Sequence, residues 1–542
     1  MIQQQQNRRD RSALKQRREQ VLAQFATHGF TRGPHRIVRT GPSWNNAQSL
    51  GLKLRAALSD LGPIFSAFGR YLATRVDVLP AADCLELEAI ADNASPMPIA
   101  DVWALIERDS GAAAEDAFLF FESEPFKSCL LYQLHHATLR DNAKPVIVKL
   151  VHPEVAPELL CDVEVLESIA PAIEGPKRSA IYKTVVADFA SALRQQIDLT
   201  HEAKALETLR RDAQDFELLR VPEIIYELSG TSVLTIEDLP GEITSIDQRG
   251  KLDRHAVARL FCSAWLRQAL LGHVFPVEPC RANLAVVSDR EVAFTGGVFS
   301  SLPAESQSNF WNYLIASAGD SPDQACSYFL KEMRHEGACG DDEDLRHRFR
   351  QVVPFRDSGW YSDDDKNRLI EHLVVHWQAA TESGYVPSPR MACFCRGLFA
   401  IARVAQQLSP ETDPLLEGLQ EARLLESTAR MREMLSFQRL GDHVDRYAAM
   451  MMAMPQRLDQ MLTFGTEGGT RLNLHVAETA SHRRQKNSVA VMAALLLLLN
   501  AVAFALPRVT SVFVGNAWAG RINAIAFIAC GALLLLATGR TR

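Results

Sequence analysis

The chain has 542 residues, enough for several domains of average size, each with its own hydrophobic core. Its 58 Lys and Arg residues against 65 Asp and Glu residues give a net charge of −7, which excludes a globally basic nucleic-acid binder. With 47% hydrophobic residues it is not a mostly disordered chain, and its scattered cysteines form neither a disulfide framework nor a zinc ribbon.

The first 120 residues are expected to be helical. Residues 1–50 are polar and then basic, which predicts a basic helical N-terminal extension without the apolar run of a signal peptide. The basic residues between Arg8 and Arg18 either contact an anionic membrane surface or form a solvated helix face. We expect a second helical region at 51–120, before the first strands of the chain.

Strand and helix patterns alternate in the middle of the chain. The β-branched run at 146–150 predicts a strand that follows a turn at Asp141-Asn142. Residues 183–212 carry apolar side chains at helical spacing and predict one long amphipathic helix. Further elements are expected as strands at 232–236, 284–287 and 291–294, a helix at 255–272, and mostly helices over 303–480. A β-containing lobe at 121–241 and a larger helical lobe with an extension at 242–480 form the outline of a protein-kinase-like fold.

The C-terminal end contains two apolar runs, at 488–506 and 522–538. A helix over the first run would span about 28 Å, close to the roughly 30 Å of a bilayer core. Basic residues precede the first run and follow the second, so the positive-inside rule puts both ends in the cytoplasm. We therefore expect a two-helix transmembrane anchor over 487–539, with a buried helical hairpin as the alternative.

Several segments carry a family resemblance. Residues 61–80, which read LGPIFSAFGRYLATRVDVLP, are similar to the N-terminal signature of the UbiB/AarF family of atypical kinase-like proteins. Five more segments match in the family's order: Phe121–Ala137, Pro145–Val155, Gln196–Ala203, Val221–Gly241 and Gly272–Leu302. The resemblance implies an α+β, protein-kinase-like bilobal fold with helical N- and C-terminal extensions. It also implies two transmembrane helices in a bacterial inner (cytoplasmic) membrane, with the soluble domain in the cytoplasm.

The N-terminal signature and the phosphate loop depart from the family pattern. The family's Lys-x-Gly-Gln is here Ala67-Phe-Gly69-Arg70, so only the glycine is kept. Leu130 and Leu131 stand where the family has an alanine-rich loop, and their side chains would crowd the approach of phosphates. The family's Glu-x-Asp motif appears with Gln196 in place of Glu and with Asp198 retained.

The catalytic stretch departs further. Glu278 occupies the position of the family's catalytic aspartate, and Asn283 is kept either as a ligand contact or as the cap of a turn. Thr295 occupies the position of the aspartate that binds the metal between the nucleotide phosphates. A neutral threonine cannot supply the carboxylate that Mg²⁺ prefers, and a Glu278 acid would be misplaced by about 1 Å. Ordinary phosphoryl transfer is therefore not expected.

Two charged residues match the family as a pair. Lys149 corresponds to the strand lysine that contacts nucleotide phosphates, and Glu202 to its helix partner. The pair is interpreted either as part of a nucleotide site or as a structural ion pair between strand and helix. We expect no metal site, because Cys393 and Cys395 lie in an apolar helical pattern typical of a core.

These observations predict a membrane-anchored pseudokinase that supports ubiquinone biosynthesis by binding lipid intermediates or biosynthetic partners. The alternative is a divergent ATPase or atypical kinase that keeps Lys149, Glu202 and Asn283 and uses Glu278 as the acid. The resemblance implies ATP and Mg²⁺ as cofactors, whereas the altered motifs argue against them. The expected partners are membrane lipid or quinone precursors and either quinone-biosynthesis proteins or a kinase-like paralogue. No nucleic acid is expected, and a homo-oligomer is left open.

Overall fold

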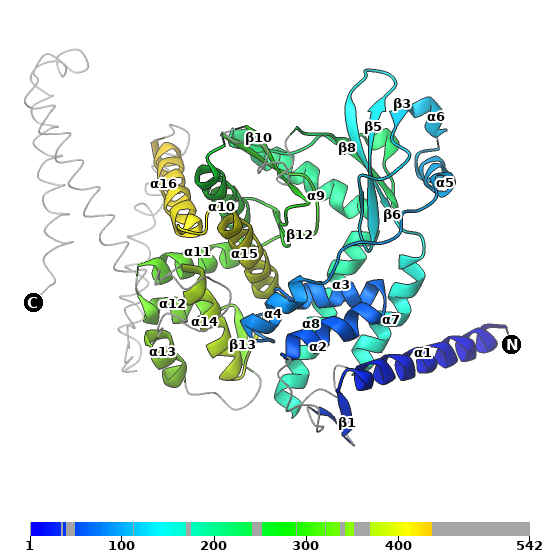
Figure 1. Cartoon of the computed structure of the whole chain (residues 1–542). Coiled ribbons are helices and arrows are strands. Elements are labelled where there is room, and N and C mark those ends of the chain that lie inside the picture. Colours follow the sequence, from blue (N-terminus) through cyan, green and yellow to red (C-terminus); the bar gives the residue numbers. More distant parts are fainter. Residues whose placement is uncertain are drawn as a thin grey trace, which may run out of the picture. The chain divides into compact units, whose positions relative to one another are not determined.

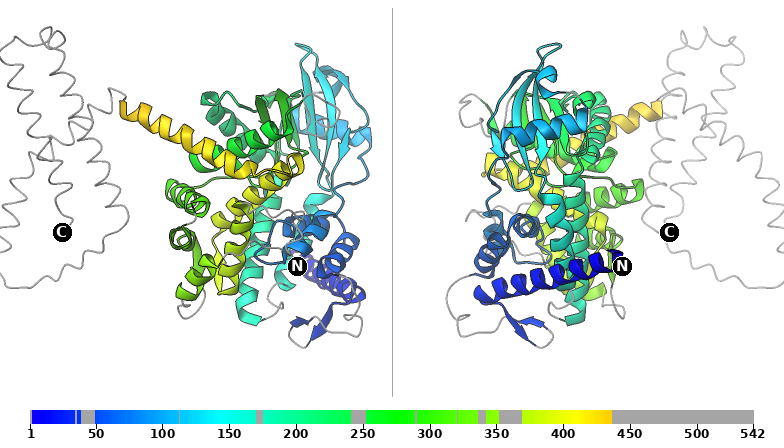
Figure 2. Two further views of the ribbon diagram at one scale, coloured as in Figure 1. Left: turned by 60° about the vertical axis from the view of Figure 1, so that its left-hand side comes forward. Right: turned by 90° about the vertical axis from the view of Figure 1, so that its right-hand side faces the viewer.

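The computed structural model describes most of the chain up to residue 435 (Figure 1). The described ranges are 2–33, 36–38, 49–111, 113–169, 175–240, 252–288, 290–319, 321–335, 342–351 and 369–435. Both views of Figure 2 place a β-sheet at one end of this part and the N-terminal helix α1 (Ile2–Thr27) at the other.

The sheet is antiparallel and has the order β3-β5-β6-β8, with the short β4 paired to β5. Its strands are β3 (Phe118–Phe121), β4 (Lys127–Ser128), β5 (Tyr132–Leu139), β6 (Pro145–Val151) and β8 (Val233–Glu237). A tight turn joins β5 to β6, as the Asp141-Asn142 pair predicts, and Ala143 takes a positive φ of 54° there. Lys149 is on the central strand β6, opposite Leu134 and Leu234.

The segment predicted as one long helix is two helices. α8 (Gly175–Ile197) ends at Ile197, and α9 (Leu199–Asp212) begins at Leu199. Asp198 separates them because its side chain accepts hydrogen bonds from the backbone N–H of Thr200 (3.1 Å) and from the Thr200 hydroxyl (2.7 Å). An aspartate that accepts in this way is an N-cap, so the new helix starts directly after it.

A set of short strands arranges the segment after α10 (Arg254–Leu271). β9 (Phe275–Pro276) pairs with β12 (Phe299–Ser300), and β10 (Leu284–Ser288) forms a hairpin with β11 (Glu291–Phe294). β11 also pairs in parallel with β7 (Leu219–Arg220). The connections β9–β10 and β11–β12 therefore lie side by side, and Val277 N–H donates to the carbonyl of Val298 (2.8 Å).

The described residues between Ala304 and Leu435 are mostly helical. They also contain one two-stranded pair, β13 (Met333–His335) and β14 (Tyr385–Pro387). The helices are α11 (Ala304–Ala318), α12 (Pro322–Leu330), α13 (Asp342–Arg350), α14 (Leu369–Glu382), α15 (Pro389–Leu408) and α16 (Pro414–Leu435). Ser388 caps α15 by accepting from Met391 N–H (3.2 Å), and Pro389 takes the first helical position. The central helices α10 and α15 pack through Trp265 and Phe394, whose ring centroids are 5.6 Å apart.

The N-terminal signature, residues 61–80, contains α3 (Pro63–Leu72). It lies between α2 (Leu50–Asp60) and α4 (Ala81–Glu88), which pack against α3, and α5 (Ile99–Ser110) follows near the sheet (Figure 1). Gly69 is buried in α3, and a Cβ atom there would come within 2.3 Å of the Ile90 side chain. The retained glycine of the signature therefore has a packing reason, because α3 approaches the residues after α4 too closely for a side chain.

The predicted fold class needs correction at the C-terminal end. Within the described residues no helix is both long and apolar enough to cross a membrane. The longest of them, the 26-residue α1, consists mostly of polar and charged residues. Residues 488–506 and 522–538, where the transmembrane helices were expected, lie outside the described residues. The described residues therefore form a mixed α/β, kinase-like fold, and none of their helices is a transmembrane helix.

Candidate functional site

A cavity of about 400 Å³ brings several of the predicted site residues together. Lys149, Glu278 and Asn283 line it, and so do Ala67 and Gln196, the neutral residues at the two altered motif positions. They come from the sheet, from the β9–β10 connection, from α3 and from α8. Segments far apart in the sequence thus converge on one site.

One charged cluster of the site consists of Lys149 and Glu202, and we call it the Lys149 pair. Lys149 Nζ donates to Glu202 Oε2 at 2.7 Å, and both residues are buried, with 7% and 4% exposed surface. The Lys149 ammonium also lies 4.0 Å from the centroid of the Tyr132 ring, on β5. Two opposite charges at this distance neutralise one another, so the pair contributes little net charge to the cavity.

The turn after β11 depends on Glu202 as well. The backbone N–H of Gly297 donates to Glu202 Oε1 (2.9 Å), so both oxygens of this carboxylate have donors. Gly297 has a φ of +119°, and a Cβ there would lie 2.7 Å from the Asn283 amide nitrogen. A glycine is required for both reasons. Thr295 is close by in sequence, yet it is not among the residues that line the cavity.

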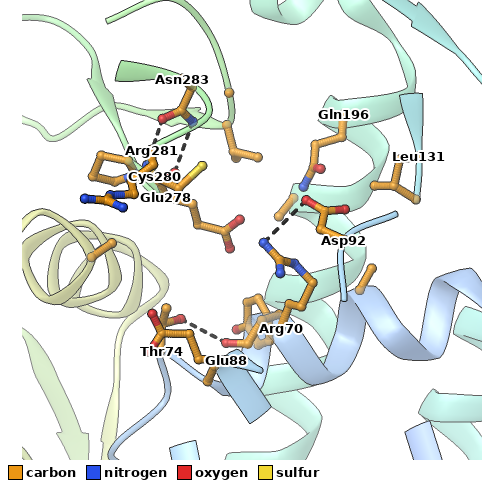
Figure 3. A pocket seen from close by; sticks show the side chains of 18 of the residues that line it. Arg70, Thr74, Glu88, Asp92, Leu131, Gln196, Glu278, Cys280, Arg281 and Asn283 are labelled. Carbon is orange, nitrogen blue, oxygen red and sulfur yellow. Dashed lines mark hydrogen bonds and ion pairs between the residues drawn. The ribbon is translucent and has the colours of Figure 1, made fainter. Parts of the chain in front are cut away.

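The Asn283 side chain forms hydrogen bonds within the turn that contains it. Its side-chain oxygen accepts from Cys280 N–H (2.7 Å), and its amide nitrogen donates to the carbonyl of Glu278 (3.2 Å), as Figure 3 shows. Its own carbonyl accepts from Thr295 N–H at 3.0 Å. The cap of a turn, one of the two roles considered for this residue, is thus formed, although Asn283 also lines the cavity.

A second charged cluster reaches the cavity through Tyr71 and Glu278, and we call it the Arg396 cluster. Its members are Tyr71, Arg75, Asp77, Asp188, Glu278 and Arg396. Arg75 and Arg396 are 0% exposed, and the first binds Asp77 through two hydrogen bonds of 2.8 and 2.7 Å. Buried guanidinium groups need carboxylate partners, because an unpaired charge in a protein interior is very costly.

Asp188, on α8, joins the two arginines of the cluster. It accepts from the Tyr71 hydroxyl (2.6 Å) and from Arg396 Nη1 (3.2 Å), while Arg75 Nη1 lies 4.0 Å away. The Tyr71 hydroxyl in turn accepts from Arg75 at 2.6 Å. Burial, followed by the Asp188 charge, raises the pKa of Tyr71 against the opposing effect of Arg75. Asp77 holds the pKa of Arg75 above its usual value although burial alone would lower it.

Glu278 belongs to this cluster. Its Oε1 forms an ion pair with Arg396 Nη2, and its side chain remains 33% exposed toward the cavity. In Figure 3 the Glu278 carboxylate and the Arg70 guanidinium enter the cavity from opposite sides. Glu278, at the catalytic position, therefore has the buried Arg396 as its counter-ion.

Substituted motif positions shape the remaining walls. Arg70 donates to the carbonyl of Ile90 (3.0 Å) and lies 3.4 Å from the Asp92 carboxylate. Leu130 and Leu131 line the cavity where the family's phosphate loop would lie, and Leu130 N–H donates to Asp92 (3.2 Å). Gly69 and Asp198 are not lining residues: the first has a packing role and the second caps α9.

The residues present do not fit a Mg²⁺–ATP complex. Thr295 brings no charge, Glu278 is paired with Arg396, and Glu202 is saturated by Lys149 and Gly297. Within the part of the chain that the structure describes, no three His, Cys, Asp or Glu side chains converge as metal ligands. Glu88 and Asp92 also line the cavity, and they pair with Arg403 and Arg70. Mg²⁺ in phosphoryl-transfer sites requires at least one carboxylate, and each carboxylate that lines this cavity already has a basic partner.

Sequence motifs did not reveal Arg396 or Asp188. Both lie in helices, and the 303–480 region that contains Arg396 has no motif that carries chemistry. One signal was present: Arg396 is the only charged residue in the apolar stretch 391–402 of α15. Arginine is almost never fully buried without a partner, so this pattern indicates a buried ion pair.

Comparison with known proteins gives the family. Residues 89–325 match the model of the ABC1 atypical kinase-like domain. A protein of Xanthomonas oryzae pv. oryzae described as "Probable protein kinase UbiB" is 32% identical over 278 residues, which cover 48% of this chain. The chain spans about half the length, 50%, of this relative and of other Xanthomonas relatives that it matches.

Longer matches come from two other bacteria, under the same description. The Xylella fastidiosa M12 protein is 31% identical over 69% of this chain and 71% of its own length, and the Pseudomonas entomophila protein is 32% identical over 70% and 67%. A solved Mycobacterium tuberculosis structure, "The complex structure of Rv3197-erythromycin", covers 59% of this chain and 84% of its own at 15% identity. Its TM-score of 0.39 is too low to carry an argument. The long matches and the domain model together show that the chain belongs to the UbiB family of atypical kinase-like proteins.

Proposed function

We propose that this chain supports ubiquinone biosynthesis as a pseudokinase, that is, without transferring a phosphoryl group. The proposal rests on the residues that occupy the two positions where the family has an acidic side chain in its kinase site. One is the neutral Thr295, and the other is Glu278, which is paired with the buried Arg396. Without a free carboxylate at either position, a binding role is better supported than a catalytic one.

The lining of the cavity supports an amphipathic ligand. Leu130 and Leu131 come from the loop at the sheet, Phe189 from α8, and Phe399 and Val404 from α15. Charged side chains line the same cavity, among them Arg70 and Arg281. Apolar walls with a few polar groups are typical of small-molecule sites, and a quinone precursor with its hydrocarbon chain has matching chemistry. Quinone-biosynthesis proteins or a kinase-like paralogue are the proposed protein partners.

One observation favours the alternative, a divergent ATPase. The Lys149 pair is fully assembled, with its atoms 2.7 Å apart. In an active site this lysine would contact phosphate oxygens while Glu202 orients it. The pair alone is equally suited to tie β6 to α9, so nucleotide binding has to be measured.

Titration of the purified full chain with ATP, with and without Mg²⁺, distinguishes the two functions. The pseudokinase proposal predicts no Mg²⁺-dependent binding and no hydrolysis by the native chain. Mg²⁺-dependent binding that disappears in Lys149→Met would overturn it and establish the ATPase. Thr295→Asp serves as the matched gain-of-charge variant. Metal-dependent binding by this variant alone would show that the missing carboxylate is the cause.

The biosynthetic role has its own experiment. Ubiquinone content is measured in cells that lack the gene and in cells complemented with the native chain. We expect ubiquinone to fall without the gene and to recover with both the native chain and the Lys149→Met/Glu202→Gln variant, which removes both charges together. Unchanged ubiquinone in the deletion strain would refute the biosynthetic role. Recovery by the native chain but not by a folded double variant would contradict the non-catalytic part of the proposal.

A further inference from the structure

The Glu278 carboxylate, at the catalytic position, forms an ion pair with an arginine of α15. Arg396 projects from the middle of α15 and is 0% exposed. One of its terminal nitrogens, Nη1, donates to Asp188 (3.2 Å), and the other, Nη2, pairs with Glu278. Its guanidinium also lies 4.2 Å from the centroid of the Tyr71 ring. Its Nε atom has no hydrogen-bond partner among the described residues, so Asp188 and Glu278 are the polar contacts of this guanidinium.

The distribution of charge explains why Glu278 is needed. Asp77 is bound by Arg75 through two hydrogen bonds, so this carboxylate is already committed. Asp188 is shared by the Tyr71 hydroxyl, Arg396 and, at 4.0 Å, Arg75. Arg396 therefore shares its one carboxylate partner on α8, and Glu278 supplies a second.

We propose that Arg396 is a positioning residue, which fixes the β9–β10 connection through Glu278. In this arrangement Glu278 acts as a structural counter-ion and not as a general base. The connection that it anchors presents Cys280, Arg281 and Asn283 to the cavity. The inference rests on the same Glu278–Arg396 pair as the proposed function, but it does not depend on which ligand the cavity binds. An unchanged labelling rate in the experiment below would overturn this inference alone, whereas ATP hydrolysis by the native chain would overturn the proposed function as well.

Cys280 offers a reporter inside the site. It is a free thiol, partly exposed, two residues from Glu278, and it lines the cavity. Its backbone N–H is held by Asn283, so its accessibility depends on the turn that Glu278 anchors. If the ion pair with Arg396 is lost, local opening of this turn becomes easier and the thiol reacts faster.

The experiment measures the rate at which iodoacetamide modifies Cys280 in the full chain, followed by mass spectrometry of the Cys280 peptide. Glu278→Gln is expected to increase this rate by about tenfold or more, because it removes the charge that anchors the turn. The matched control is Glu88→Gln. Glu88 lines the same cavity and pairs with Arg403, which lies on α15 like Arg396. Its labelling rate is expected to stay within about twofold of the native rate, since an exposed pair contributes little.

Two results would overturn the proposal. One is a Cys280 labelling rate in Glu278→Gln that equals the rate of the Glu88→Gln control. The other is hydrolysis of ATP by the native chain that Glu278→Gln abolishes without any change in labelling, because this would make Glu278 a catalytic residue. If Glu278→Gln does not fold, thermal stability of Arg396→Met is compared with that of Arg396→Met/Glu278→Gln. We expect the second substitution to restore part of the lost stability, and additive losses would contradict the pairing.

Discussion

The two charged clusters that flank the cavity are built in different ways. The Lys149 pair joins neighbouring elements, β6 and α9, with one lysine, one carboxylate and a backbone N–H. The Arg396 cluster joins α3, α8, α15 and the β9–β10 connection, with two arginines and three carboxylates. The first follows a family motif, whereas the second joins residues of two motifs to Asp188 and Arg396, which no motif predicted.

The difference shows where a kinase-like site can change its function. The Lys149 pair has the residues of a nucleotide site, but both oxygens of its Glu202 carboxylate already accept hydrogen bonds. The Arg396 cluster engages the catalytic-position acid in the interior of the protein. A residue on a distant helix thus determines whether a motif residue is available for chemistry. The substitutions below test which cluster stabilises the fold more strongly.

The largest effect is expected from Arg75→Met. This change leaves Asp77 without its two hydrogen bonds and removes a charge that offsets Asp188. Removal of one partner from a buried ion pair costs roughly 3–5 kcal/mol, and the loss of an arginine with two acidic neighbours belongs at the upper end. Thermal unfolding of the full chain, followed by circular dichroism, measures the change.

The control for this prediction is Arg403→Met, on α15. Its pair with Glu88 is partly exposed, with 24% and 44% of the two side chains accessible. An exposed pair of this kind contributes at most about 1 kcal/mol. Equal losses of stability in the two variants would mean that the Arg396 cluster is no more important than a surface contact.

A smaller effect is expected when the Lys149 pair is broken. Lys149→Met leaves the buried Glu202 carboxylate with the Gly297 N–H as its remaining hydrogen bond, which puts the expected cost near the lower end of the roughly 3–5 kcal/mol range. The double variant Lys149→Met/Glu202→Gln carries no buried charge and should recover much of this loss. Thermal unfolding of the native chain and of the three variants gives the coupling energy directly. A double variant less stable than Lys149→Met would contradict a purely electrostatic pair.

The sequence predicts local features well and long-range ones poorly. The β5–β6 turn, α10 and the β10–β11 hairpin occur where periodicity and turn residues predict them, because each depends on neighbouring residues. The break between α8 and α9 was missed, since helical spacing continues across Asp198 while its capping bonds interrupt the helix. The ion pair between Glu278 and Arg396 spans more than one hundred residues, and no spacing rule encodes such a contact.

The last prediction concerns a buried titratable group outside both clusters. His376, on α14, is 3% exposed, stacks on Phe349 at 3.9 Å between ring centroids, and contacts the Tyr313 hydroxyl (3.2 Å). Burial, and to a lesser extent the charge of His372, lower its pKa to about 3. In the unfolded chain a histidine has a pKa of about 6.5, so between these two values the unfolded state binds more protons than the folded one. The stability that His376 contributes is therefore complete above pH 6.5 and is lost as the pH falls toward 3.

At pH 5 this loss amounts to about 2 kcal/mol. In His376→Phe the ring stack can persist while the titration disappears. The melting temperature of this variant should therefore decrease less than that of the native chain between pH 7.5 and pH 5. Neither of the two charged clusters contains a histidine, so they do not share this proton uptake. An unchanged slope in His376→Phe would assign the acid sensitivity of the fold to other groups, of which the buried His135 and His152, with pKa values also lowered by burial, are the next to test.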